Sequence, residues 1–321
     1  MRIRSIDGLR GISCIIVVFF HFFNETWKTE FPFYKNSIIN FIFDGNLAVS
    51  IFFIISGYAL SISFVKNGDT ESIVRPAIKR WPRLSIPVFS SSIFVYLLYK
   101  FGFIFNKEAG IQLNSSWLRD FLPNTPDLYG VMKFSLITVF KFHSHNSLNP
   151  FLWTMHYELI GSIFLFITFF LIKTNKLLII YLSMLIFLCI SDIKSISFIL
   201  CFFIGYFFCC FKIRKKENYI NFKNCEIIFF VSLFLISILF KELYYSDIFF
   251  PIKSFIIFFV SLSSKKIVSF LESKPIQYLG EISFPLFLFQ FPILVSFFSY
   301  IIVKYYIYNS LITSIIIALS G

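Results

Sequence analysis

The sequence predicts an all-α protein, a polytopic bundle of transmembrane helices. Its 321 residues are 57% hydrophobic and only 14% charged, which is too apolar for an ordinary soluble domain. Several apolar runs reach the roughly 20 residues that a helix needs to cross a bilayer. The runs are continuous rather than alternating, and this favours helices over the strands of a membrane barrel.

Charge and cysteine content narrow the class further. A net charge of +12 could indicate nucleic-acid binding, but basic residues beside membrane spans are explained by orientation, so we expect no nucleic-acid partner. The six cysteines form no C-x-x-C pair, and we expect neither a disulfide framework nor a metal site. The N-terminal apolar segment lacks an A-x-A-like cleavage site, and we interpret it as a retained first span.

We expect about ten spans in a single membrane domain that covers residues 1–321, with no appended soluble domain. The spans are predicted over residues 6–24, 46–65, 84–105, 152–172, 177–190, 196–211, 226–240, 249–264, 280–303 and 306–320.

Basic residues predict the orientation of these spans. With the N-terminus inside, 18 of the 29 lysines and arginines fall on cytoplasmic segments, which indicates that both termini are cytoplasmic. The longest stretch between spans, about 106–151, then lies outside, and loops of more than about 15 residues are often functional. Within it, Leu128–Phe142 is apolar enough to form an additional interfacial or re-entrant helix.

Three ionisable residues mark the first span. Arg10 and His21 are eleven positions apart, nearly three helical turns, so both side chains share one face about 16 Å apart along the axis. Asp7 lies on the preceding turn. Ionisable groups in an apolar helix usually mark function, and a histidine near a carboxylate can take a proton from a hydroxyl. The alternative is structural: Arg10 anchors the helix at the headgroups, and His21 makes one interhelical hydrogen bond.

A cationic stretch precedes the third span. Lys79, Arg80 and Arg83 are three cations in five residues at its cytoplasmic start. Arginines can bind the phosphates of a cytosolic substrate bidentately, although simple anchoring of the span would produce the same charge pattern.

Two polar features lie in later spans. Glu158 follows Trp153 where the chain re-enters the membrane from outside, and such a carboxylate is either a candidate site or a group in headgroup water beside an aromatic anchor. Gln290 lies well inside the ninth span, where most polar groups only bond to a neighbouring helix.

Five short motifs follow one another along the chain. They are Ser5–Gly11 with His21 at the Arg-x10-His spacing, Ser56-Gly57-Tyr58, Arg80 and Arg83 with Pro87, Trp153-Thr154-Met155 with Glu158, and Gly280–Pro292. Taken together and in order, these motifs resemble acyltransferase family 3, the integral-membrane acyltransferases that decorate surface glycans. In the last motif, Phe284, Phe287 and Gln290 stand where the family pattern has two tyrosines and a histidine.

The resemblance implies about ten spans, an acyl-CoA donor, usually acetyl-CoA, and a sugar hydroxyl as acceptor. We interpret the chain as an O-acetyltransferase of the bacterial inner membrane that acts on O-antigen, capsule or their undecaprenyl-linked precursor, within the lipid bilayer. The alternatives are a polysaccharide transporter or flippase without acyl transfer, and an acyltransferase with another acyl donor, such as succinyl-CoA, or another acceptor.

The residues receive hypothetical roles in this interpretation. Arg80 and Arg83 hold coenzyme A phosphates at the cytoplasmic face, and Arg10 lines the path of the donor. His21, deeper in the membrane, activates the acceptor hydroxyl or carries the acyl group, and Glu158, near the outer side, orients His21 or the sugar. The remaining candidates are Asp7 beside the catalytic histidine and Tyr58, Trp153, Ser283 and Gln290 at the substrate.

Overall fold

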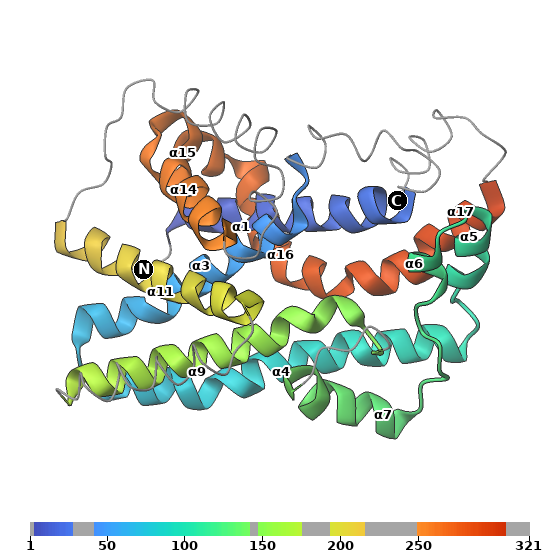
Figure 1. Ribbon diagram of the computed structural model, residues 1–321, viewed down its shortest axis with the longest axis horizontal. Coiled ribbons are helices and arrows are strands. Elements are labelled where there is room, and N and C mark those ends of the chain that lie inside the picture. Colours follow the sequence, from blue (N-terminus) through green and yellow to red (C-terminus); the bar gives the residue numbers. More distant parts are fainter. Residues whose placement is uncertain (1–2, 28–41, 142–146, 175–192, 216–248, 306–321) are drawn as a thin grey trace. The chain divides into compact units, whose positions relative to one another are not determined.

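The computed structural model describes residues 3–27, 42–141, 147–174, 193–215 and 249–305 (Figure 1). Every regular element within these ranges is a helix, as the sequence predicts. The longer elements are α1 (Arg4–Phe19) with η1 (Phe20–Glu25), α3 (Gly45–Asn67), α4 (Glu71–Lys100), η4 (Pro150–Trp153) with α9 (Thr154–Lys173), α11 (Ile193–Lys215), α14 (Phe250–Ser263) with α15 (Lys265–Leu271), and α16 (Lys274–Ile293) with η6 (Leu294–Phe298) and α17 (Ser299–Tyr305).

Five helical stretches in this part of the chain are long and apolar enough to cross a membrane. They are Arg4–Glu25, Gly45–Asn67, Pro150–Lys173, Lys194–Ile213 and Lys274–Tyr305, and α14 with α15 adds a sixth if this pair, bent by 90°, forms one span. These stretches agree with a multi-helix membrane protein, but α4, which covers most of the span predicted over 84–105, is not among them. The spans predicted over 177–190, 226–240 and 306–320 lie outside the described residues.

Short helices occupy the long segment between the third and fourth predicted spans. The helix expected within Leu128–Phe142 is present as three consecutive pieces. The short elements are α5 (Asn106–Gln112), α6 (Ser116–Arg119), α7 (Leu128–Lys133), η3 (Phe134–Thr138) and α8 (Val139–Lys141).

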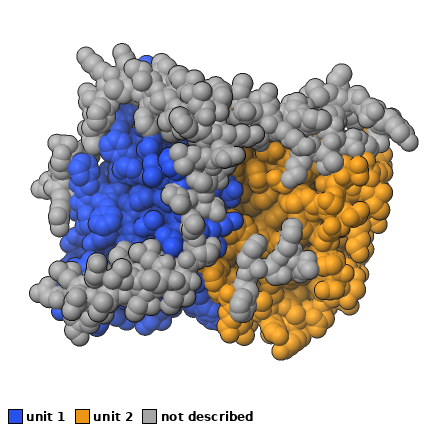
Figure 2. Space-filling view, in the orientation of Figure 1, with its two compact units in different colours: residues 1–13, 46–83, 157–283 blue, residues 14–45, 84–156, 284–321 orange. Residues whose placement is uncertain are grey.

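The chain divides into two compact units, coloured separately in Figure 2. Several of the divisions fall inside long helices, so α1, α4, α9 and α16 each contribute residues to both units. The first unit comprises residues 1–13, 46–83 and 157–283, and the second comprises residues 14–45, 84–156 and 284–321.

Glycines allow helices of the first unit to approach closely. A Cβ atom on Gly11 of α1 would lie 2.6 Å from the backbone nitrogen of Gly280 in α16. A Cβ on Gly57 of α3 would collide with the carbonyl of Phe202 in α11, and one on Gly205 would collide with the carbonyl of Ile54. Small residues at such crossings let membrane helices pack backbone to backbone. These contacts position α1 on α16 and α3 on α11.

The second unit is built on aromatic packing and on π-helical turns. The ring of Phe22 in η1 lies 4.9 Å from that of Phe298 in η6, and both belong to one buried hydrophobic cluster. Two of the π-helical segments thus pack against each other. Such segments are rare and are often found at functional sites.

A side-chain hydroxyl supports each of the three π-helical segments in this part of the chain. Thr26 Oγ1 donates to the carbonyl of His21 at 2.8 Å, and Ser299 Oγ donates to the carbonyl of Leu294 at 2.7 Å. Thr138 Oγ1 donates to the carbonyl of Lys133 at 3.2 Å. In every case the acceptor is five residues earlier, where a widened turn leaves the α-helical bonding pattern.

Candidate active site

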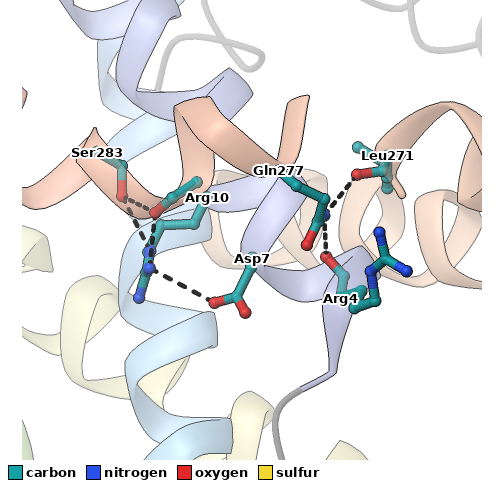
Figure 3. Close-up of polar contacts among 7 residues, drawn as sticks. Arg4, Asp7, Arg10, Leu271, Gln277 and Ser283 are labelled. Carbon is teal, nitrogen blue, oxygen red and sulfur yellow. Dashed lines mark hydrogen bonds and ion pairs between the residues drawn. The ribbon is translucent and has the colours of Figure 1, made fainter. Parts of the chain in front are cut away.

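Arg10 is held by three groups in the first unit (Figure 3). Its Nε donates to Ser283 Oγ at 3.0 Å, and its Nη2 donates to the Gly280 carbonyl at 2.7 Å. Asp7 Oδ1 lies 3.4 Å from Nη2, one helical turn away on α1. Ser283 Oγ donates in turn to the Gly280 carbonyl at 2.8 Å. The structure therefore brings three predicted site residues together as one charge-balanced group.

The same stretch of α1 is fixed at its start. Gln277 Nε2 donates to the carbonyl of Arg4 at 2.7 Å and to that of Leu271 at 2.8 Å (Figure 3). Arg4 Nη2 donates to the carbonyl of Glu272 at 3.2 Å. With the glycine contact between the two helices, these bonds fix the position of α1, and Arg10 with it, against α16. A guanidinium placed on such a rigid support keeps its direction.

Glu158 of α9 forms the centre of a second polar group in the first unit. Its carboxylate makes an ion pair with Arg80 of α4, and Ser56 Oγ of α3 donates to its Oε1 at 2.7 Å. The Arg80 guanidinium also donates to the Glu158 carbonyl at 3.3 Å. The two charged side chains are only 12% and 13% exposed. Both carboxylate oxygens of Glu158 are thus engaged, whereas Arg80 Nε has no partner among the described residues.

The depth of this pair differs from the sequence-based placement. The two side chains form an ion pair, so Arg80 and Glu158 cannot lie near opposite membrane faces, as the sequence suggested. The hydropathy pattern could not show this, because it contains no information on which helices pair.

His21 lies in η1 of the second unit, inside an aromatic stack. Its imidazole lies 3.9 Å from the ring of Phe151, with the planes 13° apart, and 6.0 Å from the nearly parallel ring of Trp117. Nδ1 is buried and has no hydrogen-bond partner among the described residues. An imidazole that stacks by one face on another ring keeps its ring nitrogens at its edge for another partner. His21 is therefore not explained by an interhelical hydrogen bond through Nδ1.

Gln290 of α16 is also buried in the second unit, at 1% exposure. Neither its Nε2 nor its Oε1 has a partner among the described residues. By contrast, the hydroxyl of Ser91 in α4 has two partners. It donates to the Leu288 carbonyl of α16 at 2.7 Å and accepts from Asn149 Nδ2 at 3.4 Å. A buried amide without a partner is costly, so Gln290 keeps its place among the substrate-binding candidates.

The remaining candidates have simpler surroundings. Arg83 is exposed on α4. Tyr58 is buried on α3, with its ring 5.9 Å from that of Phe208. Trp153 is half-buried at the end of η4. Within the described residues, no hydrogen bond joins the side chain of Arg83 or Tyr58 to His21, Glu158 or Arg10.

Four residues around these groups were not predicted as site residues. Ser56 lies within the Ser56-Gly57-Tyr58 motif, so the sequence carried a signal for it. Thr26, Trp117 and Phe151 carried none, because a threonine at the end of a helix and aromatic residues in an aromatic-rich chain are ordinary. Only the three-dimensional arrangement places them on His21.

Comparison with protein families defines the class of the chain. The family model of acyltransferase family 3, described as an acyltransferase domain, matches residues 3–321, essentially the whole chain. The protein is therefore a membrane acyltransferase. It belongs to acyltransferase family 3, as the ordered motifs of the sequence predicted. Searches of curated proteins and of solved structures gave no match.

Proposed function

We propose that the protein is an O-acetyltransferase of the bacterial inner membrane. It moves an acetyl group from cytosolic acetyl-CoA to a sugar hydroxyl of a surface polysaccharide, O-antigen or capsule, or of its undecaprenyl-linked precursor. Family membership supports acyl transfer. The observation that carries the proposal further is the imidazole of His21, which is stacked on the ring of Phe151 and has a buried ring nitrogen without a partner among the described residues.

His21 acts as the general base in this proposal. The oxygen of the sugar hydroxyl attacks the thioester carbonyl carbon while its proton passes to the imidazole. The carbon–sulfur bond breaks, and the coenzyme A thiolate leaves and takes up the proton. General-base help of this kind typically contributes 10²–10⁴-fold in rate. The flat rings of Phe151 and Trp117 fix the plane of the imidazole, so that its edge faces the reacting group.

The three arginines have separate roles toward the donor in this proposal. Arg83 is exposed and available to the phosphates of coenzyme A. Arg80 already binds Glu158, so its contribution to the donor comes through its unpartnered Nε. The Arg10 group, neutralised by Asp7 and fixed by Ser283, lines the path of the donor. Glu158 holds Arg80 in this arrangement and orients the sugar.

In this proposal the donor and the acceptor reach the protein from opposite faces of the membrane. Ten spans with both termini in the cytoplasm leave residues 106–151 outside, so the donor binds from one face and the acceptor from the other. The acetyl group then crosses the membrane while the sugar does not. The excess of basic residues on the cytoplasmic segments supports this orientation.

The decisive experiment uses the purified protein in lipid nanodiscs, acetyl-CoA labelled in the acetyl group, and the chemically de-O-acetylated surface polysaccharide of the source organism. We expect label to appear on the polysaccharide as base-labile ester, and the glycan of a strain without the gene to lack these esters. Movement of polysaccharide across vesicles without any labelled ester would show a transporter instead. Transfer from succinyl-CoA but not from acetyl-CoA would correct the donor.

A further inference from the structure

A cavity of about 310 Å³ opens in the second unit beside the end of α4. This volume is at the lower end of the range of small-molecule sites, about 300–1,000 Å³. The polar and aromatic side chains that line it are those of Tyr99, Asn106, Lys107, Glu108, Asn124 and Thr125. None of them belongs to the candidate active site described above.

Several polar groups of this cavity have no partner among the described residues. Lys107, Glu108, Asn124 and Thr125 are exposed, and none of these four makes a side-chain hydrogen bond or ion pair to a described residue. Asn106 is fully buried, and its Oδ1 has no partner in the described part of the chain. A buried acceptor left without a bond costs free energy.

The wall of the cavity is rigid. Asn106 Nδ2 donates to the carbonyls of Leu118 and Phe121, each at 3.0 Å, and so fixes the turn that follows α6. Leu122 has a φ of 53°, a left-handed conformation that a leucine adopts only when its surroundings enforce it. Such residues cluster at binding sites and active sites. The cavity is therefore formed before any ligand arrives.

The same turn connects the cavity to His21. Asn106 binds the carbonyls of Leu118 and Phe121, and Trp117 directly precedes Leu118. The ring of Phe121 lies 5.8 Å from that of Phe151, which in turn stacks on His21 at 3.9 Å. One wall of the cavity thus continues into the aromatic stack around the imidazole, on the same short segment of chain.

We propose that this cavity binds a sugar unit of the acceptor glycan, next to the unit whose hydroxyl is acetylated. The inference rests on the proposed function, in which residues 106–151 lie outside. The hydroxyl groups of a sugar both donate and accept hydrogen bonds, which suits the amides and hydroxyl gathered here. Tyr99 adds an apolar ring face. A phosphate would favour clustered cations, whereas here the one lysine is followed by a glutamate.

The test compares two variants in nanodiscs without acetyl-CoA. Asn124→Ala/Thr125→Ala removes two exposed polar groups of the cavity, and Ser116→Ala removes an exposed hydroxyl of α6 that does not line it. The probes are fragments of the de-O-acetylated polysaccharide, one and four repeat units long, titrated by calorimetry. We expect the double variant to bind the longer fragment about tenfold more weakly. The control should bind it like the wild type, and all three proteins should bind acetyl-CoA equally.

Transfer kinetics provide a second measurement. We expect the double variant to raise KM for the longer acceptor about tenfold and to leave kcat for the single unit unchanged. Equal affinity of the double variant and the control for the longer fragment would overturn this inference while leaving the proposed function intact. Failure of the wild type to bind any fragment would overturn the glycan acceptor itself. Weaker binding of the double variant to anionic lipid vesicles, with unchanged glycan binding, would assign the cavity to a lipid headgroup and overturn the inference.

Discussion

The hydroxyl of Thr26 is the most direct test of how the fold positions His21. Thr26 is fully buried, and its Oγ1 donates to the carbonyl of His21 at 2.8 Å, across the π-helical turn that carries the imidazole. Thr26→Val keeps the shape of the side chain and removes only this donor. The His21 carbonyl then loses its support in a buried setting, and the turn can relax towards α-helical spacing.

The size of the effect follows from that one bond. Leaving a buried acceptor without its partner costs about 1–3 kcal/mol. If about 1–2 kcal/mol of this favours the relaxed turn, the share of molecules with a correctly placed imidazole falls about 5- to 30-fold, since 1.4 kcal/mol corresponds to tenfold. We expect kcat to fall by that factor, and KM for acetyl-CoA to remain unchanged because Thr26 lies outside the proposed donor path.

The assay measures labelled acetyl transfer by the purified variant, with two comparisons. Thr26→Ser keeps the donor and should restore most of the activity. Thr138→Val removes the equivalent bond from η3, 3.2 Å long, which carries no candidate site residue, and should leave transfer unchanged. A valine variant that transfers acetyl groups like the wild type would refute the positioning role. A serine variant as slow as the valine variant would show that side-chain volume matters and the hydrogen bond does not.

Three further predictions test the other groups. His21→Gln should still bind acetyl-CoA but lose most transfer, by about 10²–10⁴-fold, because an amide cannot take the proton; near-normal transfer would remove His21 from the chemistry. Arg83→Ala should weaken acetyl-CoA binding by about 1.5–3 kcal/mol, measured by calorimetry, and Arg83→Lys should recover little; unchanged affinity would return Arg83 to membrane anchoring. Glu158→Gln should destabilise the protein by about 3 kcal/mol or more in thermal unfolding, because it leaves the Arg80 charge buried without a counterion, and Glu158→Gln/Arg80→Met should recover part of that loss. A single variant as stable as the wild type would show that the pair is not held in a buried setting.

Local features of the fold could be predicted from the sequence because they depend on neighbouring residues. The apolar runs that became Arg4–Glu25 and Gly45–Asn67 were expected within two residues at each end, because hydropathy alone decides whether a segment leaves water. The helix within Leu128–Phe142 was found for the same reason. The π-helical turn at His21 was not, because it depends on Thr26 and on packing against Phe298, which is far away in the sequence.

In the candidate site, too, contacts between near neighbours in the sequence could be predicted and contacts between distant residues could not. Arg10 with Asp7 could be expected, because the two lie one turn apart on a single helix, and the motif pattern singled out Ser283 in advance. The pairing of Arg80 with Glu158 could not, because 78 residues separate them and each alone is explained by membrane anchoring. An arginine and a glutamate that are each costly to bury alone are tolerated as a buried pair, so each is the physical reason for the other. A charge near the end of a predicted span is therefore not evidence of headgroup water by itself, because a helix packed against it can supply the opposite charge.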